Sequence, residues 1–361
     1  MSDPLRLLLL SGASSVHTVR WANAFAQRPG MEVHLATQHD PIDPLHPAVV
    51  LHRLPHRKGA GYLLNGPRLR TLVQRIAPHV VNAHYATGYG TLARWAGRAP
   101  VVLNVWGSDV YAFPAGGPLR RKLVQGNLRR ARLLVSTSEA MADRVQVLCP
   151  ELPRAEVVPF GVVTELFRPS DAGAARSRLV VGTVKVLAPK YGIDTLLRAF
   201  ASVVRDHGHD AGLRLVGDGP QEGELRALAA ELGLADRVEF VPRVAHGLVP
   251  QELARLDVYA ALSRSDSESF GVAVIEASAC GLPVVVSDAG GLPEVVVDGI
   301  TGHVVRREDP QAAAAAIAGL LADAGSRARM GRAGRDHVVQ HYRWADCVER
   351  MAAVLRRAAG R

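Results

Sequence analysis

Short apolar runs alternate with amphipathic stretches through the first half of the chain. Apolar residues recur at helical spacing over 17–27 and 67–76, so helices are expected there. The apolar runs between them predict strands at 5–10, 32–36, 80–82, 101–105 and 133–136. Strands that alternate with helices in this way form parallel sheets covered on both faces.

The same alternation returns in the second half of the chain. Between the halves, residues 168–178 are polar and predict a linker. A length of 361 residues suits two domains, so we expect an α/β fold of two doubly wound parallel-sheet domains, at 1–167 and 179–340. The strands expected in the second domain lie at 180–183, 213–216, 238–240, 258–262 and 283–287.

Two carboxylates flank a Phe-Gly step in this second half. The pattern predicts a loop around Glu268 and a helix from Gly271, which puts Glu276 roughly 7 to 8 Å along the helix axis. The free N–H groups at a helix start suit a phosphate, and carboxylates accept hydrogen bonds from sugar hydroxyls. The pair therefore fits a nucleotide sugar. Alternatively, both are ordinary solvated helix charges, although the apolar neighbours of Glu276 disfavour this.

Composition adds a bias in the cations. The net charge of +9 favours anionic partners such as phosphates, and only four of the 43 basic residues are lysine. Two of these, Lys185 and Lys190, lie five residues apart, where a compact ammonium group suits a phosphate oxygen. Solvated loop charges are the alternative. The three cysteines have no metal-type spacing, so we expect a reduced, cytoplasmic protein.

These motifs resemble family 4 glycosyltransferases in order and spacing across about residues 155–305. They are Val-Gly-Thr-Val-Lys at 181–185, Lys-Tyr-Gly-Ile-Asp at 190–194, the Gly-Asp-Gly-Pro turn at 217–220, the two glutamates, and the segment 281–294. The resemblance implies a GT-B fold, with two Rossmann-like domains facing across a cleft and the donor held mainly by the second. It also implies retention of anomeric configuration, no catalytic metal or cofactor, and a terminal helix at 341–361 that crosses back to the first domain.

The resemblance also assigns roles to individual residues. Lys185 and Lys190 are expected to hold the donor diphosphate, Glu268 to meet the sugar hydroxyls, and Glu276 to bind the ribose. Together with His84, the first three are the candidate catalytic residues. The candidate donor-binding residues are Gly12, Gly217, Asp218, Arg243, Val244, Phe270, Gly271, Val272 and Glu276.

The first half departs further from the family pattern. The first loop has one glycine, Gly12, where many members have two, and Trp106 stands where many have a histidine. His84 and Asp109 are the nearby replacements, and His17, Trp106 and Asp109 are the candidate acceptor-binding residues. A histidine bonded to backbone and a tryptophan engaged in packing are the competing interpretations of His84 and Trp106. A family position that is often Asp is Val163 here.

We therefore expect a retaining, metal-independent hexosyl- or N-acetylhexosaminyltransferase that uses a UDP- or GDP-type sugar. The acceptor hydroxyl could belong to a polysaccharide, a lipid-linked intermediate, an aminocyclitol or another small natural product. An epimerase on the same fold and a non-enzymatic nucleotide-sugar sensor are the alternatives. Residues 119–132 carry six cations on an expected helix, which fits either peripheral contact with an anionic membrane or a solvated face. No nucleic-acid recognition motif is present.

Overall fold

The computed structural model describes residues 3–170 and 178–361, and it divides into two compact units. Unit 1 comprises the chain up to Phe160 together with Ala345–Arg361, and unit 2 comprises Gly161–Trp344. The first unit thus ends at Phe160 rather than at residue 167. Of the expected linker at 168–178, residues 171–177 lie outside the described residues. Among the described residues, no helix is long and apolar enough to span a bilayer.

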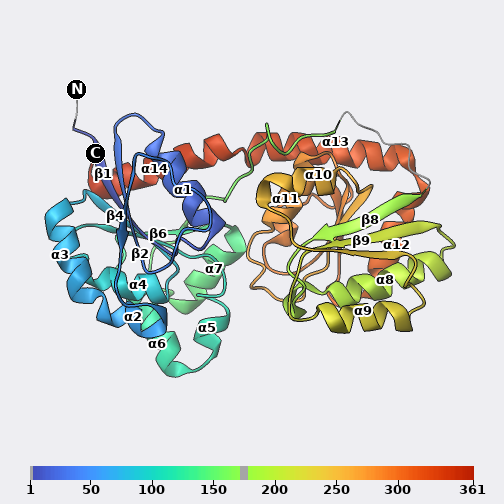
Figure 1. The fold of residues 1–361 in the computed structure, drawn as a ribbon, viewed down its shortest axis with the longest axis horizontal. Coiled ribbons are helices and arrows are strands. Elements are labelled where there is room, and N and C mark those ends of the chain that lie inside the picture. The colour runs from blue at the N-terminus through green and yellow to red at the C-terminus, as the bar shows by residue number, and fades with distance from the viewer. Residues whose placement is uncertain (1–2, 171–177) are drawn as a thin grey trace. The chain divides into compact units, whose positions relative to one another are not determined.

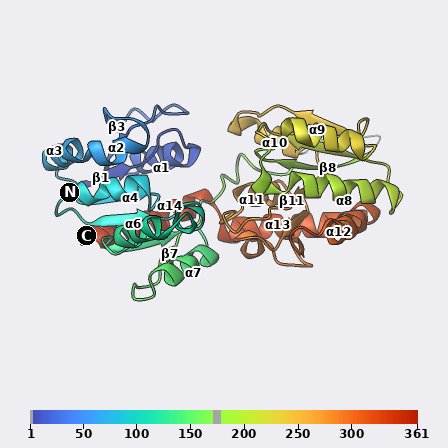
Figure 2. The ribbon, with the colours of Figure 1, turned by 90° about the horizontal axis from the view of Figure 1, so that it is seen from below.

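Unit 1 is built on a seven-stranded parallel sheet in the order β3-β2-β1-β4-β5-β6-β7, with helices on both faces (Figures 1 and 2). Its strands are β1 (Leu5–Leu10), β2 (Met31–Thr37), β3 (Val49–Arg53), β4 (Val80–His84), β5 (Val101–Asn104), β6 (Leu133–Ser136) and β7 (Glu156–Val157). Its helices are α1 (Val16–Ala26), α2 (Lys58–Leu64), α3 (Gly66–Ile76), α4 (Gly88–Leu92), α5 (Ala112–Ala115), α6 (Pro118–Leu128), α7 (Glu139–Leu148) and α14 (Trp344–Ala359).

Unit 2 is a six-stranded parallel sheet in the order β10-β9-β8-β11-β12-β13. Its strands are β8 (Leu179–Val184), β9 (Ala211–Val216), β10 (Val238–Val241), β11 (Val258–Ala261), β12 (Val284–Ser287) and β13 (Gly302–Val305). Its helices are α8 (Ile193–Arg205), α9 (Glu222–Glu231), α10 (Val249–Leu253), α11 (Val272–Ala279), α12 (Pro310–Ala322) and α13 (Ala324–His341), with short 3-10 turns η2 (Pro189–Tyr191), η3 (His246–Leu248) and η4 (Leu292–Glu294).

The predicted two-sheet α/β architecture is confirmed, and the ten expected strands are all present. The three strands that the pattern missed, β3, β7 and β13, each lie at an edge of their sheet. An edge strand is buried less completely than a central one, so its sequence lacks a continuous apolar run. All the strands that the pattern missed are thus edge strands, although the edge strand β10 was predicted.

Two helix predictions need correction at their ends. The basic segment 119–132 is not one helix, because α6 ends at Leu128, and three of its six cations follow the helix. The terminal helix begins at Trp344 rather than at His341, because α13 ends at His341. Within unit 1, α14 buries Cys347, Met351 and Leu355.

Candidate functional site

Each sheet reverses its winding direction at one place, and the predicted residues gather there. In unit 2 the reversal lies between β8 and β11, and in unit 1 between β1 and β4. In open α/β sheets, ligands bind outside the carboxyl ends of the strands at this reversal. Lys185 directly follows β8, and the loop that carries Glu268 follows β11.

Lys185 and Glu268 form a buried ion pair at the reversal in unit 2. The Lys185 Nζ lies 2.9 Å from the Glu268 Oε1, with the two side chains 19% and 9% exposed. Burial is the largest single influence and opposes the charged form of Lys185. The charge and hydrogen bond of Glu268 and the nearby hydroxyls of Tyr191 and Tyr259 together outweigh it, so the pKa of Lys185 is raised. The sequence predicted that both side chains contact a donor, but it did not predict that they pair with each other.

Lys190 and Lys185 both place their ammonium groups near the aromatic ring of Tyr191. The Lys185 Nζ lies 4.5 Å and the Lys190 Nζ 4.6 Å from the centroid of the Tyr191 ring. Ammonium groups are attracted to the negative face of an aromatic ring. The backbone fixes this turn, because the Arg264 N–H donates to the Lys190 carbonyl at 2.9 Å. Two ammonium groups are thereby held on one small surface.

Glycines hold the Glu268 loop in place by close backbone contact. The Gly291 N–H donates to the Glu268 carbonyl at 3.0 Å. A Cβ on Gly290 would lie 2.3 Å from the Glu268 carbonyl oxygen, which leaves no room for a side chain. The Gly-Gly step of the segment 281–294 therefore positions the carboxylate of Glu268.

The Gly217 turn packs against the residues that follow β8. Gly217 has φ of 144°, and a Cβ there would lie 2.0 Å from the Lys185 carbonyl oxygen. The Asp218 carbonyl accepts a hydrogen bond of 2.9 Å from the Leu187 N–H, while the Asp218 side chain is exposed. The turn therefore fixes the backbone beside Lys185 through main-chain contacts.

Helix α11 begins at the predicted Phe-Gly step. Gly271 is its N-cap in the left-handed region, with φ of 93°, and Val272 is its first residue. No side chain caps the helix start, and Phe270 is buried against Tyr342 with ring centroids 5.6 Å apart. The predicted positions of Glu268 on a loop and Glu276 within a helix are both confirmed.

Glu276 is buried and paired with a histidine that the sequence interpretation did not select. The His246 Nε2 lies 2.8 Å from the Glu276 Oε1, and the Glu276 side chain is 8% exposed. His246 lies in η3, just after the candidate donor-binding residues Arg243, which is exposed, and Val244, which is half-buried. The apolar surroundings of Glu276 had indicated that a partner was needed, but the partner lies 30 residues earlier in the chain.

His84 lies at the corresponding reversal in unit 1, but it is fully buried. Its Nδ1 is 2.9 Å from the Ser11 Oγ, which in turn lies 2.7 Å from the Thr18 Oγ1. Burial, with a smaller contribution from the nearby charge of His17, lowers the pKa of His84 to about 3. His84 is thus neutral near pH 7.

Trp106 belongs to an aromatic cluster at the same end of the sheet. Its ring centroid lies 4.3 Å from that of His84 and 5.1 Å from that of Phe160. His17 stacks on Phe160 with ring centroids 4.1 Å apart, and it meets the Trp106 ring edge to face at 6.0 Å. The three candidate residues His84, His17 and Trp106 therefore lie next to one another.

Asp109 joins two loops of unit 1 rather than facing solvent. It is 1% exposed and accepts hydrogen bonds from the backbone N–H groups of Ala86 at 2.7 Å, Gly107 at 2.9 Å and Trp106 at 3.1 Å. Burial raises the pKa of its carboxyl group despite these bonds. Through these hydrogen bonds, Asp109 connects the loop after β4 to the loop after β5.

Gly12 is the one donor-binding candidate that lies in unit 1. A Cβ on Gly12 would be 3.5 Å from the His39 Nδ1, which is itself 2.8 Å from the Tyr89 hydroxyl oxygen. The remaining donor-binding candidates all belong to unit 2. Two groups of predicted residues therefore exist, each assembled within its own unit.

Comparison with known proteins decides the family. A model of the glycosyl transferases group 1 matches residues 169–337, and a glycosyl transferase 4-like model matches residues 6–138. A protein of Mycolicibacterium smegmatis, the GDP-mannose-dependent alpha-(1-6)-phosphatidylinositol monomannoside mannosyltransferase, is 34% identical over 281 residues, or 74% of this chain and 72% of that protein. The chain belongs to the family 4 glycosyltransferases. The resemblance predicted from the motifs is confirmed.

Other relatives of this glycosyltransferase are similar over different shares of their length. The D-inositol 3-phosphate glycosyltransferase of Acidothermus cellulolyticus is 37% identical over 260 residues, which cover 67% of this chain and 57% of that protein. The structure of sucrose-phosphate synthase from Thermosynechococcus elongatus superimposes with a TM-score of 0.84 at 22% identity and covers 98% of both chains. The GT-B fold predicted for this glycosyltransferase is thereby confirmed.

Proposed function

We propose that this glycosyltransferase holds a nucleoside-diphosphate sugar on unit 2 and transfers the sugar to a hydroxyl acceptor with retention of configuration. The names of its relatives make GDP-mannose the first donor to test and an inositol-bearing compound the first acceptor. The ion pair between Lys185 and Glu268 carries the proposal. It places a cation for phosphate and a carboxylate for sugar hydroxyls side by side at the start of α11.

The two lysines supply positive charge where the reaction develops negative charge. The bond between the anomeric carbon and the diphosphate oxygen breaks, and the acceptor oxygen forms the new bond to that carbon on the same face. The acceptor proton passes to the departing phosphate oxygen. Lys185 and Lys190 then offset the charge on the leaving diphosphate without a metal ion. Their common position on the Tyr191 ring supports this role.

Glu268 and Glu276 orient the two ends of the donor in this proposal. Donor binding exchanges the contact of Glu268 with Lys185 for contacts between Lys185 and phosphate and between Glu268 and sugar hydroxyls. Glu276 receives the ribose hydroxyls, and His246 positions its carboxylate. Because His84 is buried and neutral, we assign it a positioning role through Ser11 rather than proton transfer.

Calorimetry and donor turnover test the proposal. GDP-mannose, UDP-glucose and their nucleotides are titrated into the wild type, Lys185→Ala, Glu268→Ala and Lys122→Ala, the last being an exposed lysine of unit 1 and the matched control. We expect weaker binding in the first two variants only. Nucleotide release from the preferred donor should persist in EDTA and be lost in Glu268→Ala. Equal affinity in all four proteins contradicts the donor site.

Product analysis separates the transferase from the other activities. NMR of the product with an inositol acceptor should show the same anomeric configuration as the donor. Donor binding without nucleotide release would instead support a sensor, and conversion of the donor sugar without nucleotide release would support an epimerase.

A further inference from the structure

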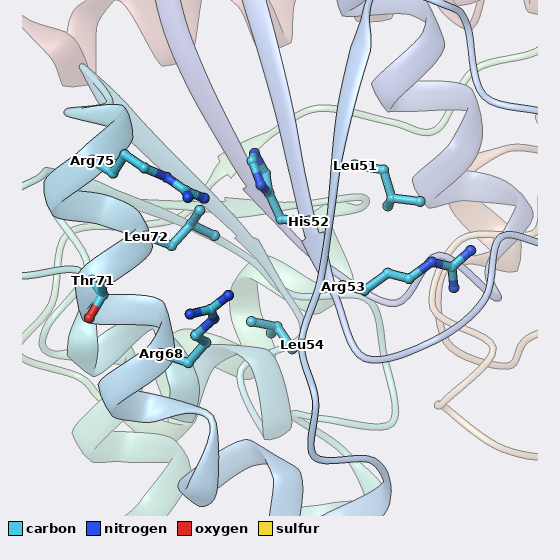
Figure 3. Close-up of a pocket in the computed structure, with 8 residues that line it drawn as sticks. All are labelled: Leu51, His52, Arg53, Leu54, Arg68, Thr71, Leu72 and Arg75. Carbon is cyan, nitrogen blue, oxygen red and sulfur yellow. The ribbon is translucent and has the colours of Figure 1, made fainter.

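A hollow outside the candidate donor site lies between β3 and α3 of unit 1. It has a volume of about 220 Å³, and Figure 3 shows side chains of the helix and the strand pointing into it from opposite sides. The buried side chains of Leu54 and Leu72 contribute an apolar floor. No carboxylate is among the lining residues, which are Leu51, His52, Arg53, Leu54, Arg68, Thr71, Leu72 and Arg75.

Two arginines of α3 face this hollow without protein partners. Arg68 and Arg75 are seven residues apart, so two helical turns bring them to the same face. Figure 3 shows both guanidinium groups directed toward β3. Within the described residues, neither side chain makes a hydrogen bond or an ion pair. By contrast, Arg53 points to the other side of the strand and pairs with Asp40.

His52 is the third polar side chain of this lining, and it is linked to a carboxylate through a second histidine. The Glu32 Oε1 lies 2.9 Å from the His34 Nε2, and the His34 Nδ1 lies 2.9 Å from the His52 Nε2. The ionised carboxylate only accepts, so the His34 Nε2 donates to it. When both imidazole rings are neutral, the His34 Nδ1 therefore accepts a hydrogen bond from the His52 Nε2–H. The His52 Nδ1 is left as an acceptor with no partner among the described residues.

We propose that this hollow binds a phosphate-bearing anion through the guanidinium groups of Arg68 and Arg75 and the imidazole of His52. Guanidinium groups match phosphate oxygens in fork geometry, and two that have no carboxylate partner retain their full capacity to donate. The phosphate could belong to a soluble phosphomonoester or to a lipid head group that ends in a phosphomonoester, and both present the same phosphate end. The site is independent of the proposed donor site, whose lysines and glutamates lie in unit 2.

The free nitrogen of His52 favours phosphate over sulfate. Burial, followed by the nearby charges of His34 and Arg75, lowers the pKa of His52 to about 4, so the ring is neutral near pH 7. A phosphomonoester, whose second pKa is about 6, can bring its own proton and donate it to the His52 Nδ1. A sulfate ion has no such proton. The groups facing His52 are His34, Arg68 and Arg75, with Glu32 behind His34.

Calorimetric titration with inorganic phosphate and sulfate tests this site in the full chain. A Lys185→Ala/Lys190→Ala background removes phosphate binding at the donor lysines. Arg68→Gln/Arg75→Gln is compared with Arg70→Gln/Arg98→Gln, which removes two exposed arginines of unit 1 that line a different hollow. We expect phosphate affinity to fall about tenfold or more in the first double variant and by less than about twofold in the second. His52→Gln should reduce the preference for phosphate over sulfate.

Vesicle flotation distinguishes the two sources of phosphate. Phosphatidic acid exposes a phosphomonoester, whereas phosphatidylglycerol of the same content does not. Binding of phosphatidic acid that depends on Arg68 and Arg75 identifies a lipid head group, and phosphate binding without it identifies a soluble ligand. Equal losses in both double variants, or no phosphate or vesicle binding that needs these arginines, overturns the proposal. Nucleotide affinity should be unchanged in Arg68→Gln/Arg75→Gln, so this result is separable from the donor test.

Discussion

The two sheets reverse their winding in the same way, yet they place opposite kinds of chemistry at the reversal. In unit 2, two buried carboxylates have side-chain partners: Glu268 pairs with Lys185, and Glu276 with His246. In unit 1, the corresponding position holds a neutral histidine, His84, which is buried and packs against the Trp106 ring. One position therefore carries a buried ion pair, and the other carries a neutral, hydrogen-bonded ring.

The difference follows from what each arrangement costs. A buried charge is tolerated only with a partner, and both buried carboxylates of unit 2 have one. A neutral, buried histidine carries no such cost, and it remains bonded to Ser11. In the proposed function, a donor must therefore compete with the contact between Lys185 and Glu268, whereas the unit 1 cluster needs no such exchange. Four substitutions test this contrast, in order of decreasing expected effect.

Removing one charge of the unit 2 pair should have the largest effect. In Lys185→Met, the buried carboxylate of Glu268 loses its partner, and we expect the free energy of unfolding to fall by about 3 kcal/mol. The double variant Lys185→Met/Glu268→Gln should recover most of this loss, because it leaves no unpaired charge. Urea unfolding measures both. Donor binding should remain lost in the double variant, and equal instability in both variants would contradict an electrostatic cause.

The neutral histidine of unit 1 should appear in the pH dependence of stability. The pKa of His84 is about 3 in the folded protein, below the ordinary value of 6.5. The unfolded chain therefore binds a proton that the folded protein does not, and stability falls as pH drops below 6.5. Each pH unit costs about 1.4 kcal/mol, so the loss reaches about 2 kcal/mol near pH 5.

His84→Gln should remove this part of the dependence. We expect its free energy of unfolding, compared with that of the wild type, to improve steadily between pH 6.5 and pH 5. His56→Gln is the matched control, because His56 is an exposed histidine of the same unit. Parallel pH profiles for wild type and His84→Gln would show that His84 is not held neutral in the folded protein.

Much of this architecture could be predicted from the sequence, because local patterns determine central strands and loop positions. The central strands are continuous apolar runs, and Glu268 and Glu276 stand in segments whose periodicity separates loop from helix. The motifs at 181–194 and 281–294, together with the two glutamates, then indicated the family, and the family resemblance gave the lysines and glutamates their expected roles. Each of these signals lies within a short window of sequence.

What the sequence did not reveal depends on contacts between distant residues. The pairing of Glu276 with His246 spans 30 positions, and that of Lys185 with Glu268 spans 83. Similarly, His84 was selected from its place after a strand, but its burial under Trp106 and its bond to Ser11 arise only when three loops meet. Trp106 packs as one of the two interpretations expected, whereas the partner of His84 is the Ser11 side chain rather than the backbone.

Removing the charge of Glu276, which is proposed to bind the ribose of the donor, should have a smaller and more selective effect on ligand affinity. Glu276→Gln keeps a similar shape but loses the charge that strengthens hydrogen bonds to ribose hydroxyls, so affinity for GDP should fall about tenfold. Affinity for inorganic pyrophosphate, which has no ribose, should not change. Calorimetry with both ligands checks this. A matching loss for pyrophosphate would place Glu276 at the phosphates or show a general disturbance of α11.

The smallest effect is expected at Asp218, although it lies inside the family motif. Its side chain is exposed and makes no hydrogen bond to the described residues, while its carbonyl accepts from Leu187. Because alanine preserves that main-chain contact, Asp218→Ala should change donor affinity and stability by less than about 0.5 kcal/mol. Donor titration and urea unfolding measure the two quantities. A tenfold loss of affinity with unchanged stability would show that the Asp218 carboxylate contacts the donor directly, which would add a further charged side chain to the proposed donor site of unit 2.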